Sequence, residues 1–269
     1  MMNQLPASTG WSWVKQGFSY FRSQPMEFCT LFFGYLFFML VIGLVPLLGQ
    51  LLAFVLLPLF TLSFMQGCKG IDQGIRVHPR LLLTAFRSPQ TPKLLQLGLL
   101  YLLAAVIALG LSSLVDGGVF WQVLSGQTEL STKTIEESNM MGAMLCAAVL
   151  YIPFLMAFWF AGPLIAWKNM PLFKAIFYSF VSVQRSLRAF AYYGLCWFFV
   201  GGIIPTAVSV TIATITGNAN LIIVIMMSLS MLLTIILYCS FYPTYKTLFP
   251  DVSEASGEDS GNASTISTL

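Results

Sequence analysis

The sequence predicts an all-α protein, a polytopic bundle of six transmembrane helices with three amphipathic helices on the cytoplasmic membrane surface. The first observation is composition: 57% of the 269 residues are hydrophobic and only 9% are charged, against about 25% charged in soluble domains. The second is a set of long runs without charge, and the third is the placement of the basic residues. So few charges cannot cover a water-soluble fold of this size, so most of the chain faces lipid.

The charge-free runs cover residues 28–68, 94–115, 138–167 and 189–245. A membrane-spanning helix needs about 20 mainly apolar residues, so the first and last runs are each long enough for two helices. The first run contains a turn signal at "GLVPLLGQ" and the last one at "TGNAN". We therefore expect spans at 28–45, 51–68, 94–115, 141–166, 190–213 and 221–242.

Orientation follows from lysine and arginine. With six spans, the N-terminal segment, the 69–93 and 168–188 connections and the segment after the last span share one side, and together they hold every basic residue except Lys133. By the positive-inside rule, both termini are cytoplasmic. We expect one transmembrane domain over residues 1–250, followed by a disordered acidic cytoplasmic tail at 251–269. Within the external 116–140 loop, Thr134 and Glu137 have the spacing of a capping box for the fourth span.

A short pattern recurs at Phe21, Phe86 and Phe180, each of which is followed two positions later by serine. A basic residue stands six positions before each phenylalanine, and an apolar run follows each copy. This pattern predicts three repeats, each a surface helix followed by two antiparallel spans, beginning near residues 11, 79 and 171. The alternative is chance, because any membrane protein needs phenylalanine, arginine and serine at such places.

Placed on a helical wheel, each copy separates basic residues from apolar ones. Such helices lie flat on the membrane, with the apolar side at the acyl boundary and the cations at the headgroups. The serine and a nearby glutamine would occupy the bend before the span and bond freed backbone groups there. The residues predicted to contact lipid headgroups are Lys15, Arg22, Arg80, Arg87, Lys174, Arg185 and Arg188.

The sequence offers little chemistry. No ionisable residue falls inside a predicted span core, which argues against proton coupling and against a buried metal centre. His78 is the only histidine and has no positioned nucleophile, and the five cysteines lack metal-ligand spacing. We therefore predict no catalytic residues, no metal or cofactor site and no enzyme activity. The basic residues are bunched in a few short segments, which is not the display expected of a nucleic-acid binder.

Several residues inside the spans can bend helices, namely Pro58, Pro153, Pro163, Pro205 and the pair Gly201-Gly202. Broken helices of this kind either shape a bundle or line a midplane cavity. The nearby polar residues are Asn139, Thr206, Ser209, Thr211, Ser228, Ser230 and Thr234. They would line such a cavity or form hydrogen bonds between helices, and we favour hydrogen bonding between helices.

Three stretches carry a family resemblance: "WVKQGFSYFRSQP", "LMAFWFAGPLIAWKNMPLFKAIFYS" and "YCSFYPTYKTLF". With them the chain resembles a family of uncharacterised six-span inner-membrane proteins of Gram-negative bacteria, over residues 11–249. The shared motifs are aromatic and positional. The resemblance implies a location in the bacterial inner membrane and brings no activity, substrate or site with it.

Two functional hypotheses follow. The first is a non-enzymatic membrane component that acts in envelope organisation, lipid homeostasis or assembly of a complex, with phospholipids and a membrane protein or a second copy as partners. The alternative is a channel or facilitator for an uncharged or amphipathic solute. A continuous polar-lined cavity favours the channel, and a groove open to lipid favours the first hypothesis.

Overall fold

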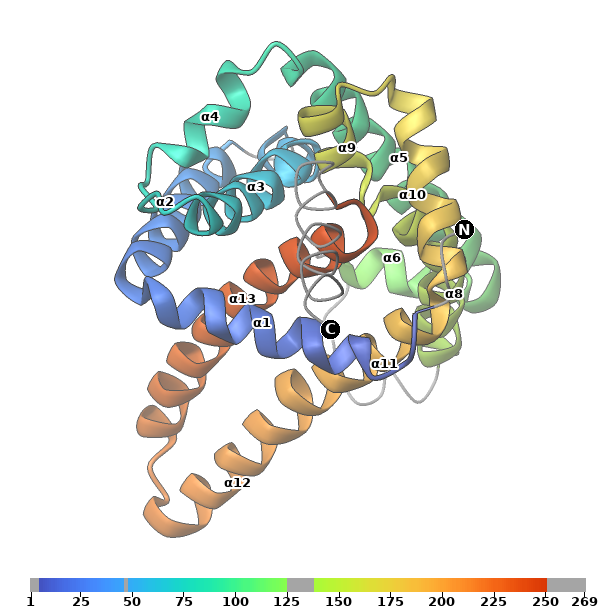
Figure 1. The fold of residues 1–269 in the computed structure, drawn as a ribbon. Helices are drawn as coiled ribbons and strands as arrows, with labels where there is room; N and C mark the ends of the chain where they lie inside the picture. The colour runs from blue at the N-terminus through green and yellow to red at the C-terminus, as the bar shows by residue number, and fades with distance from the viewer. Residues whose placement is uncertain (1–4, 46–47, 125–137, 251–269) are drawn as a thin grey trace, which may run out of the picture. The chain divides into compact units, whose positions relative to one another are not determined.

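The computed structural model describes residues 5–45, 48–124 and 138–250, and every regular element in these ranges is a helix (Figure 1). Thr134, Glu137 and the predicted tail at 251–269 lie outside the described residues. The helices are α1 (Thr9–Ser23), α2 (Pro25–Gly43), α3 (Leu48–Asp72), α4 (Leu81–Arg87), α5 (Thr91–Asp116), α6 (Val119–Leu124), α8 (Met140–Phe158), α9 (Ala161–Lys168), α10 (Leu172–Arg185), α11 (Leu187–Phe198), the π-helix η1 (Phe199–Ile203), α12 (Ile204–Thr216) and α13 (Ala219–Leu248).

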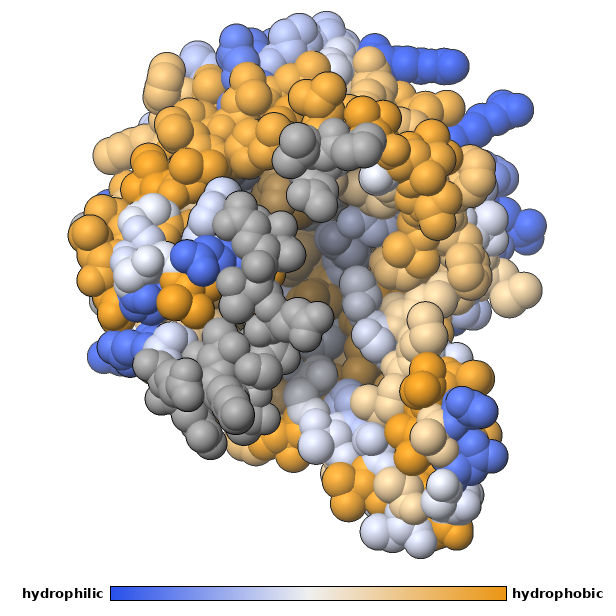
Figure 2. Space-filling view, turned by 180° about the vertical axis from the view of Figure 1, so that it is seen from behind, coloured by the Kyte–Doolittle hydropathy of each residue, from blue (hydrophilic) through white to orange (hydrophobic). Residues whose placement is uncertain are grey.

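Six stretches are long and apolar enough to cross a membrane, as predicted: Pro25–Gly43, Leu51–Asp72, Thr91–Asp116, Met140–Lys168, Leu187–Thr216 and Ala219–Leu248. The fourth stretch combines α8 and α9, and the fifth combines α11, η1 and α12. Hydrophobic residues also cover most of the surface visible in Figure 2. A polytopic all-α membrane protein is therefore the observed fold class.

The described chain divides into two compact units. The first contains residues up to Leu36, Ser63–Thr84 and the chain from Arg185 on, and the second contains Phe37–Leu62 and Ala85–Gln184. In the first unit, α1 packs across α13 and α11 (Figure 1). Close packing requires glycine in α1, since a Cβ on Gly17 would lie 2.6 Å from the Cβ of Ser240.

Trp13 is the centre of this packing. Its side chain is fully buried, its indole N–H donates to the hydroxyl of Thr247 at 2.9 Å, and its ring lies 5.1 Å from that of Phe190. Close by, the hydroxyls of Tyr193 and Ser240 share a buried hydrogen bond of 2.5 Å. The expectation that the apolar side of this helix lies among acyl chains is therefore wrong for Trp13, because α11 and α13 cover it.

In the second unit, α5 packs along α8. The rings of Tyr101 and Phe158 stack at 4.5 Å, and the Tyr101 hydroxyl donates to the Phe158 carbonyl at 3.2 Å. That carbonyl lies at the break between α8, which ends at Phe158, and α9, which begins at Ala161.

Ser179 of α10 repairs this break. Its hydroxyl is fully buried, donates to the Met156 carbonyl at 2.9 Å and accepts from the Phe160 amide N–H at 2.9 Å. A break inside a membrane leaves backbone groups without water, so a side chain must satisfy them. The broken fourth span thus depends on a serine from α10, the helix that follows it.

Helices occur at the three places where surface helices are predicted, as α1, α4 and α10. At the first two bends the expected polar contacts are present: Ser23 donates to the Tyr20 carbonyl at 2.7 Å, and Ser88 accepts from the Gln90 amide at 3.2 Å. The third copy differs, because α10 continues to Arg185 and so Ser182 lies inside the helix rather than at its bend.

The glutamines of the first two copies make parallel contacts. Gln24 accepts a hydrogen bond from the Val77 amide at 2.8 Å, in the segment just before α4. Gln90 donates to the Asn169 side chain at 2.7 Å, in the segment just before α10. Each glutamine therefore holds the chain that leads into the next helix predicted to lie on the membrane surface. This correspondence supports the threefold repeat, which stays a prediction.

Candidate functional site in the α12–α13 hairpin

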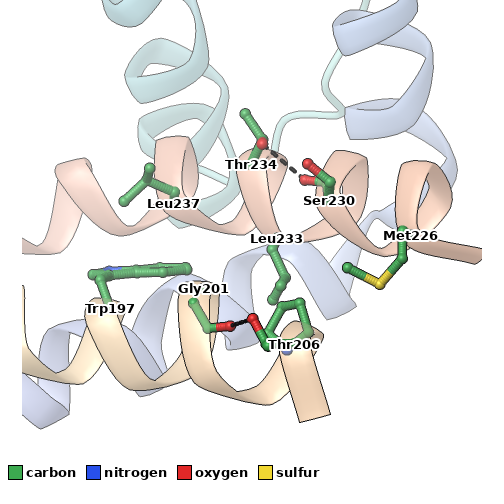
Figure 3. Close-up of a pocket in the computed structure, with 10 residues that line it drawn as sticks. Trp197, Gly201, Thr206, Met226, Ser230, Leu233, Thr234 and Leu237 are labelled. Carbon is green, nitrogen blue, oxygen red and sulfur yellow. Dashed lines mark hydrogen bonds between the residues drawn. The ribbon is translucent and has the colours of Figure 1, made fainter. Parts of the chain in front are cut away.

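The candidate site is a cavity of about 510 Å³ between the last two spans (Figure 3). Its lining comes from the end of α11 through η1 and α12 on one side, and from α13 on the other. The lining residues are Trp197, Gly201, Gly202, Pro205, Thr206, Met226, Ser230, Leu233, Thr234 and Leu237. Figure 3 shows Leu233 and Met226 of α13 pointing toward the side of Thr206, and Trp197 at one end of the groove. We call this cavity the hairpin groove.

Proline and glycine account for the local shape. Pro205 has no amide hydrogen, so the Gly201 carbonyl four residues earlier loses its α-helical donor. The chain widens there into η1, a π-helix of five residues, and such segments occur often at functional sites. No atom lies within 4 Å of where a Cβ on Gly202 would stand. The missing side chain therefore leaves open space in the groove.

The two threonine hydroxyls in the groove are bonded to backbone carbonyls of their own helices. Thr206 donates to the Gly202 carbonyl and Thr234 to the Ser230 carbonyl, each at 2.8 Å (Figure 3). Outside the groove, Thr211 and Ser228 bond in the same way to Ala207 and Val224. These bonds run within one helix, so the preference for hydrogen bonds between helices is wrong for these four residues. The groove consequently presents mainly methyl, methylene and ring surface.

Depth is the second property of the hairpin groove. Its residues 197–206 begin ten positions after Leu187 and end ten positions before Thr216, the limits of the fifth span. At about 1.5 Å per residue, this segment is the middle third of a span about 45 Å long, so it lies in the central part of a hydrocarbon layer about 30 Å thick. In the most apolar stretches of the fifth and sixth spans, only 6% and 11% of the residues are buried inside the protein. Hydrocarbon therefore reaches this part of the hairpin.

The seven cations predicted to contact headgroups are all exposed. The structure distributes them over α1 (Lys15, Arg22), the start and end of α4 (Arg80, Arg87), α10 (Lys174, Arg185) and α11 (Arg188). On α10 they share the exposed face with aromatic rings: Phe173 and Phe177 are 76% and 64% exposed, and the Lys174 ammonium lies 5.9 Å from the Tyr178 ring centre. Mixed aromatic and cationic faces are typical of membrane interfaces.

Sequence reasoning missed the role of Asp72, the last residue of α3. Its carboxylate accepts from the hydroxyls of Tyr20 and Tyr242 at 2.8 and 3.1 Å and pairs with the Lys246 ammonium at 2.9 Å. One signal was available, because Asp72 is the only acidic residue in the basic 69–93 connection. These contacts tie the ends of α1, α3 and α13 together.

The described residues contain no group of three histidine, cysteine, aspartate or glutamate side chains that could hold a metal ion. His78 is exposed in the segment before α4, and none of the lining residues of the hairpin groove is charged.

Comparison with known proteins gives one informative relative. A probable inner membrane protein of Burkholderia thailandensis is 38% identical over 251 residues, which cover 91% of this chain and 93% of the relative. No protein-family profile matches the chain, and no solved structure matches it. Together with six apolar helices, this similarity identifies a multi-pass protein of the inner membrane. The chain belongs to the same family of inner-membrane proteins as the Burkholderia protein.

Proposed function

We propose that the protein is a non-enzymatic component of the inner membrane that acts in lipid homeostasis by holding a lipid acyl chain in the hairpin groove. The observation that carries this proposal is an apolar groove at bilayer depth on two sparsely covered spans. An empty groove in contact with lipid would forfeit dispersion contacts along its lining, so hydrocarbon fills it.

The threonine hydroxyls of the groove already donate to backbone carbonyls, which favours an acyl chain over a polar solute as the ligand. A facilitator for an uncharged polar solute needs donors and acceptors that replace the solute's water. Here Thr206 and Thr234 have already given their protons to carbonyls of their own helices. Apart from the Ser230 hydroxyl and the indole N–H of Trp197, the lining that remains free to contact a ligand is apolar and includes Met226, Leu233 and Leu237, which suits a chain of methylene groups.

The test uses a phospholipid with a photoreactive group near the middle of its acyl chain, incorporated with the protein into nanodiscs. After irradiation, mass spectrometry locates the adducts. We expect adducts on the groove residues of α12 and α13, and Gly202→Leu should lower them about tenfold, the change that about 1.4 kcal/mol produces. Gly194→Leu is the matched control, because Gly194 also has open space around its Cβ position and lies outside the groove.

Three results would contradict the proposal. Equal adduct yields for the two leucine variants would mean that lipid contacts the hairpin without entering the groove. Adducts to a copurifying protein in place of lipid would identify a helix-binding site and a role in complex assembly. Reproducible flux of an uncharged solute through reconstituted liposomes, abolished by Gly202→Leu, would establish the channel alternative.

A further inference from the structure

A second groove lies on the first unit, where α1 meets α11. It has a volume of about 400 Å³ and is lined by Trp11, Tyr192, Leu195, Cys196, Phe199, Val200 and Ile204. Apart from Trp11, all of its lining comes from the fifth span. We call it the α1–α11 groove. It shares no lining residue with the hairpin groove.

The α1–α11 groove runs from the end of the span toward its middle. It begins where α1 crosses α11, because a Cβ on Gly10 would lie 2.6 Å from the Tyr193 amide nitrogen. From Tyr192 to Ile204 there are twelve residues, or about 18 Å of helix. The span itself starts at Leu187, so the groove extends from headgroup level into the hydrocarbon.

Cations stand at the shallow end only. The Lys15 ammonium lies 5.7 Å from the ring centre of Trp11. Arg188 precedes Tyr192 by four positions, and Leu195 and Phe199 follow at intervals of three and four. Residues at such intervals share one helix face, so Arg188 heads the stripe that lines the groove. Lys15 and Arg188 are exposed, and neither pairs with an acidic residue in the described chain.

Charge and shape together define the ligand. A phospholipid has an anionic phosphate at headgroup level and an acyl chain that descends from it, and this matches two cations above an apolar channel. Aromatic side chains such as Trp11 and Tyr192 favour the boundary between these two regions. We propose that the α1–α11 groove binds one anionic phospholipid, with its headgroup phosphate at Lys15 and Arg188 and an acyl chain along Leu195, Phe199 and Ile204.

This inference goes beyond the proposed function, because it assigns a headgroup class to a different groove. The hairpin groove lies about 15 Å from either end of its span and has no charged lining, so it selects for hydrocarbon alone. The α1–α11 groove adds selection by charge. A protein that senses or organises lipid needs such a distinction between headgroups.

The experiment measures binding of single lipids to the full-length protein by native mass spectrometry. Detergent-solubilised protein is titrated with phosphatidylglycerol or with phosphatidylcholine. We expect one tight phosphatidylglycerol site, which Lys15→Gln with Arg188→Gln weakens about thirtyfold, as the loss of two headgroup contacts predicts. The control is Lys174→Gln with Arg185→Gln, which removes the same charge from α10 and should leave this tight site unchanged.

Cys196 supplies a second readout inside the groove. Cys68 and Cys239 are buried, so serine at Cys29 and Cys146 leaves Cys196 as the accessible thiol. Phosphatidylglycerol should slow alkylation of Cys196, phosphatidylcholine and inorganic phosphate should not, and the Lys15 and Arg188 variant should lose the protection. Equal weakening by both double variants, or protection by phosphatidylcholine, would overturn the proposal. Photoadducts in the hairpin groove are measured separately, so either proposal can fail alone.

Discussion

The Asp72 carboxylate and the Lys246 ammonium, 174 residues apart in the sequence, form an ion pair of 2.9 Å. Their side chains are 27% and 37% exposed, so the charge pair alone contributes little to stability. Asp72 also stands at the C-terminal end of α3, where the helix dipole disfavours a negative charge. Asp72 therefore stabilises its contacts with Tyr20, Tyr242 and Lys246, and it does not stabilise α3 itself.

Asp72→Asn should lower the free energy of unfolding by about 1–2 kcal/mol, because one amide oxygen replaces a carboxylate that accepts from three donors. Lys246→Met should cost less, about 0.5 kcal/mol, since it removes only the exposed ion pair. Denaturation in mixed detergent micelles measures both. Glu27→Gln is the control, as Glu27 has no hydrogen bond or ion pair within the described chain. An equal loss for Asp72→Asn and the control would show that Asp72 does not connect the helix ends.

The environment of Tyr20 predicts that the stability of the fold falls at alkaline pH. Burial raises the pKa of its phenol above the ordinary value of 10.0, and the hydrogen bond and charge of Asp72 act in the same direction. The folded protein therefore keeps this proton while the unfolded chain releases it. Stability from Tyr20 is complete below pH 10 and falls as the pH rises from there toward the folded pKa.

The comparison of wild type with Tyr20→Phe isolates this effect. The stability advantage of the wild type should shrink by up to about 1.4 kcal/mol for each pH unit above the unfolded pKa. Unfolding curves at a series of pH values between about 9 and 11 provide the measurement. A constant difference across that range would mean that the phenol titrates equally in both states.

Ser179→Ala should destabilise the break between α8 and α9. The substitution leaves the Phe160 amide and the Met156 carbonyl without their hydroxyl partner, at a cost of about 1–3 kcal/mol for each buried group. Hydrogen exchange at Phe160 should become faster. Ser182→Ala, in the same helix, is the matched control, because Ser182 is also buried but has no hydrogen bond in the described structure. Slow exchange at Phe160 in the Ser179 variant would assign the repair to another group.

The surface cations predict lipid dependence. Replacing Arg80, Arg87, Lys174 and Arg185 together with glutamine should weaken contact with anionic lipid by about 1 kcal/mol per residue. The measurement is protection of α4 and α10 from chemical labelling in anionic and in neutral nanodiscs. Protection in anionic nanodiscs should fall in the variant. Protection that stays the same in both lipids would refute headgroup contact by these four residues.

The six spans could be predicted because hydropathy over about 20 residues is a local property. The observed stretches begin and end within several residues of the predicted ones, as at 190–213 against Leu187–Thr216. The helices α1, α4 and α10 also stand where the repeated pattern predicts them. Local sequence contains that information in full.

Contacts between distant segments could not be predicted in the same way. No feature of the sequence around Ser179 indicates that its hydroxyl bonds to Met156 and Phe160. The three groups that donate to Asp72 likewise come from two other helices, α1 and α13. On α10, small residues such as Ala175 face the protein while Phe173 and Phe177 are exposed. A helical wheel identifies an apolar side but not which side a neighbouring helix covers.

The π-helix between α11 and α12 changes the phase of the fifth span. A π-turn holds about one residue more than an α-turn, so side chains beyond it are rotated by about 100° relative to an uninterrupted α-helix. Thr206 and Pro205 face α13 because of this offset. A one-residue deletion within Phe199–Ile203 would thus replace the wide turn by a regular α-turn and leave the side chains of α12 in their present phase, whereas regular α-helical winding of the present number of residues would turn α12 away from α13 by about 100°.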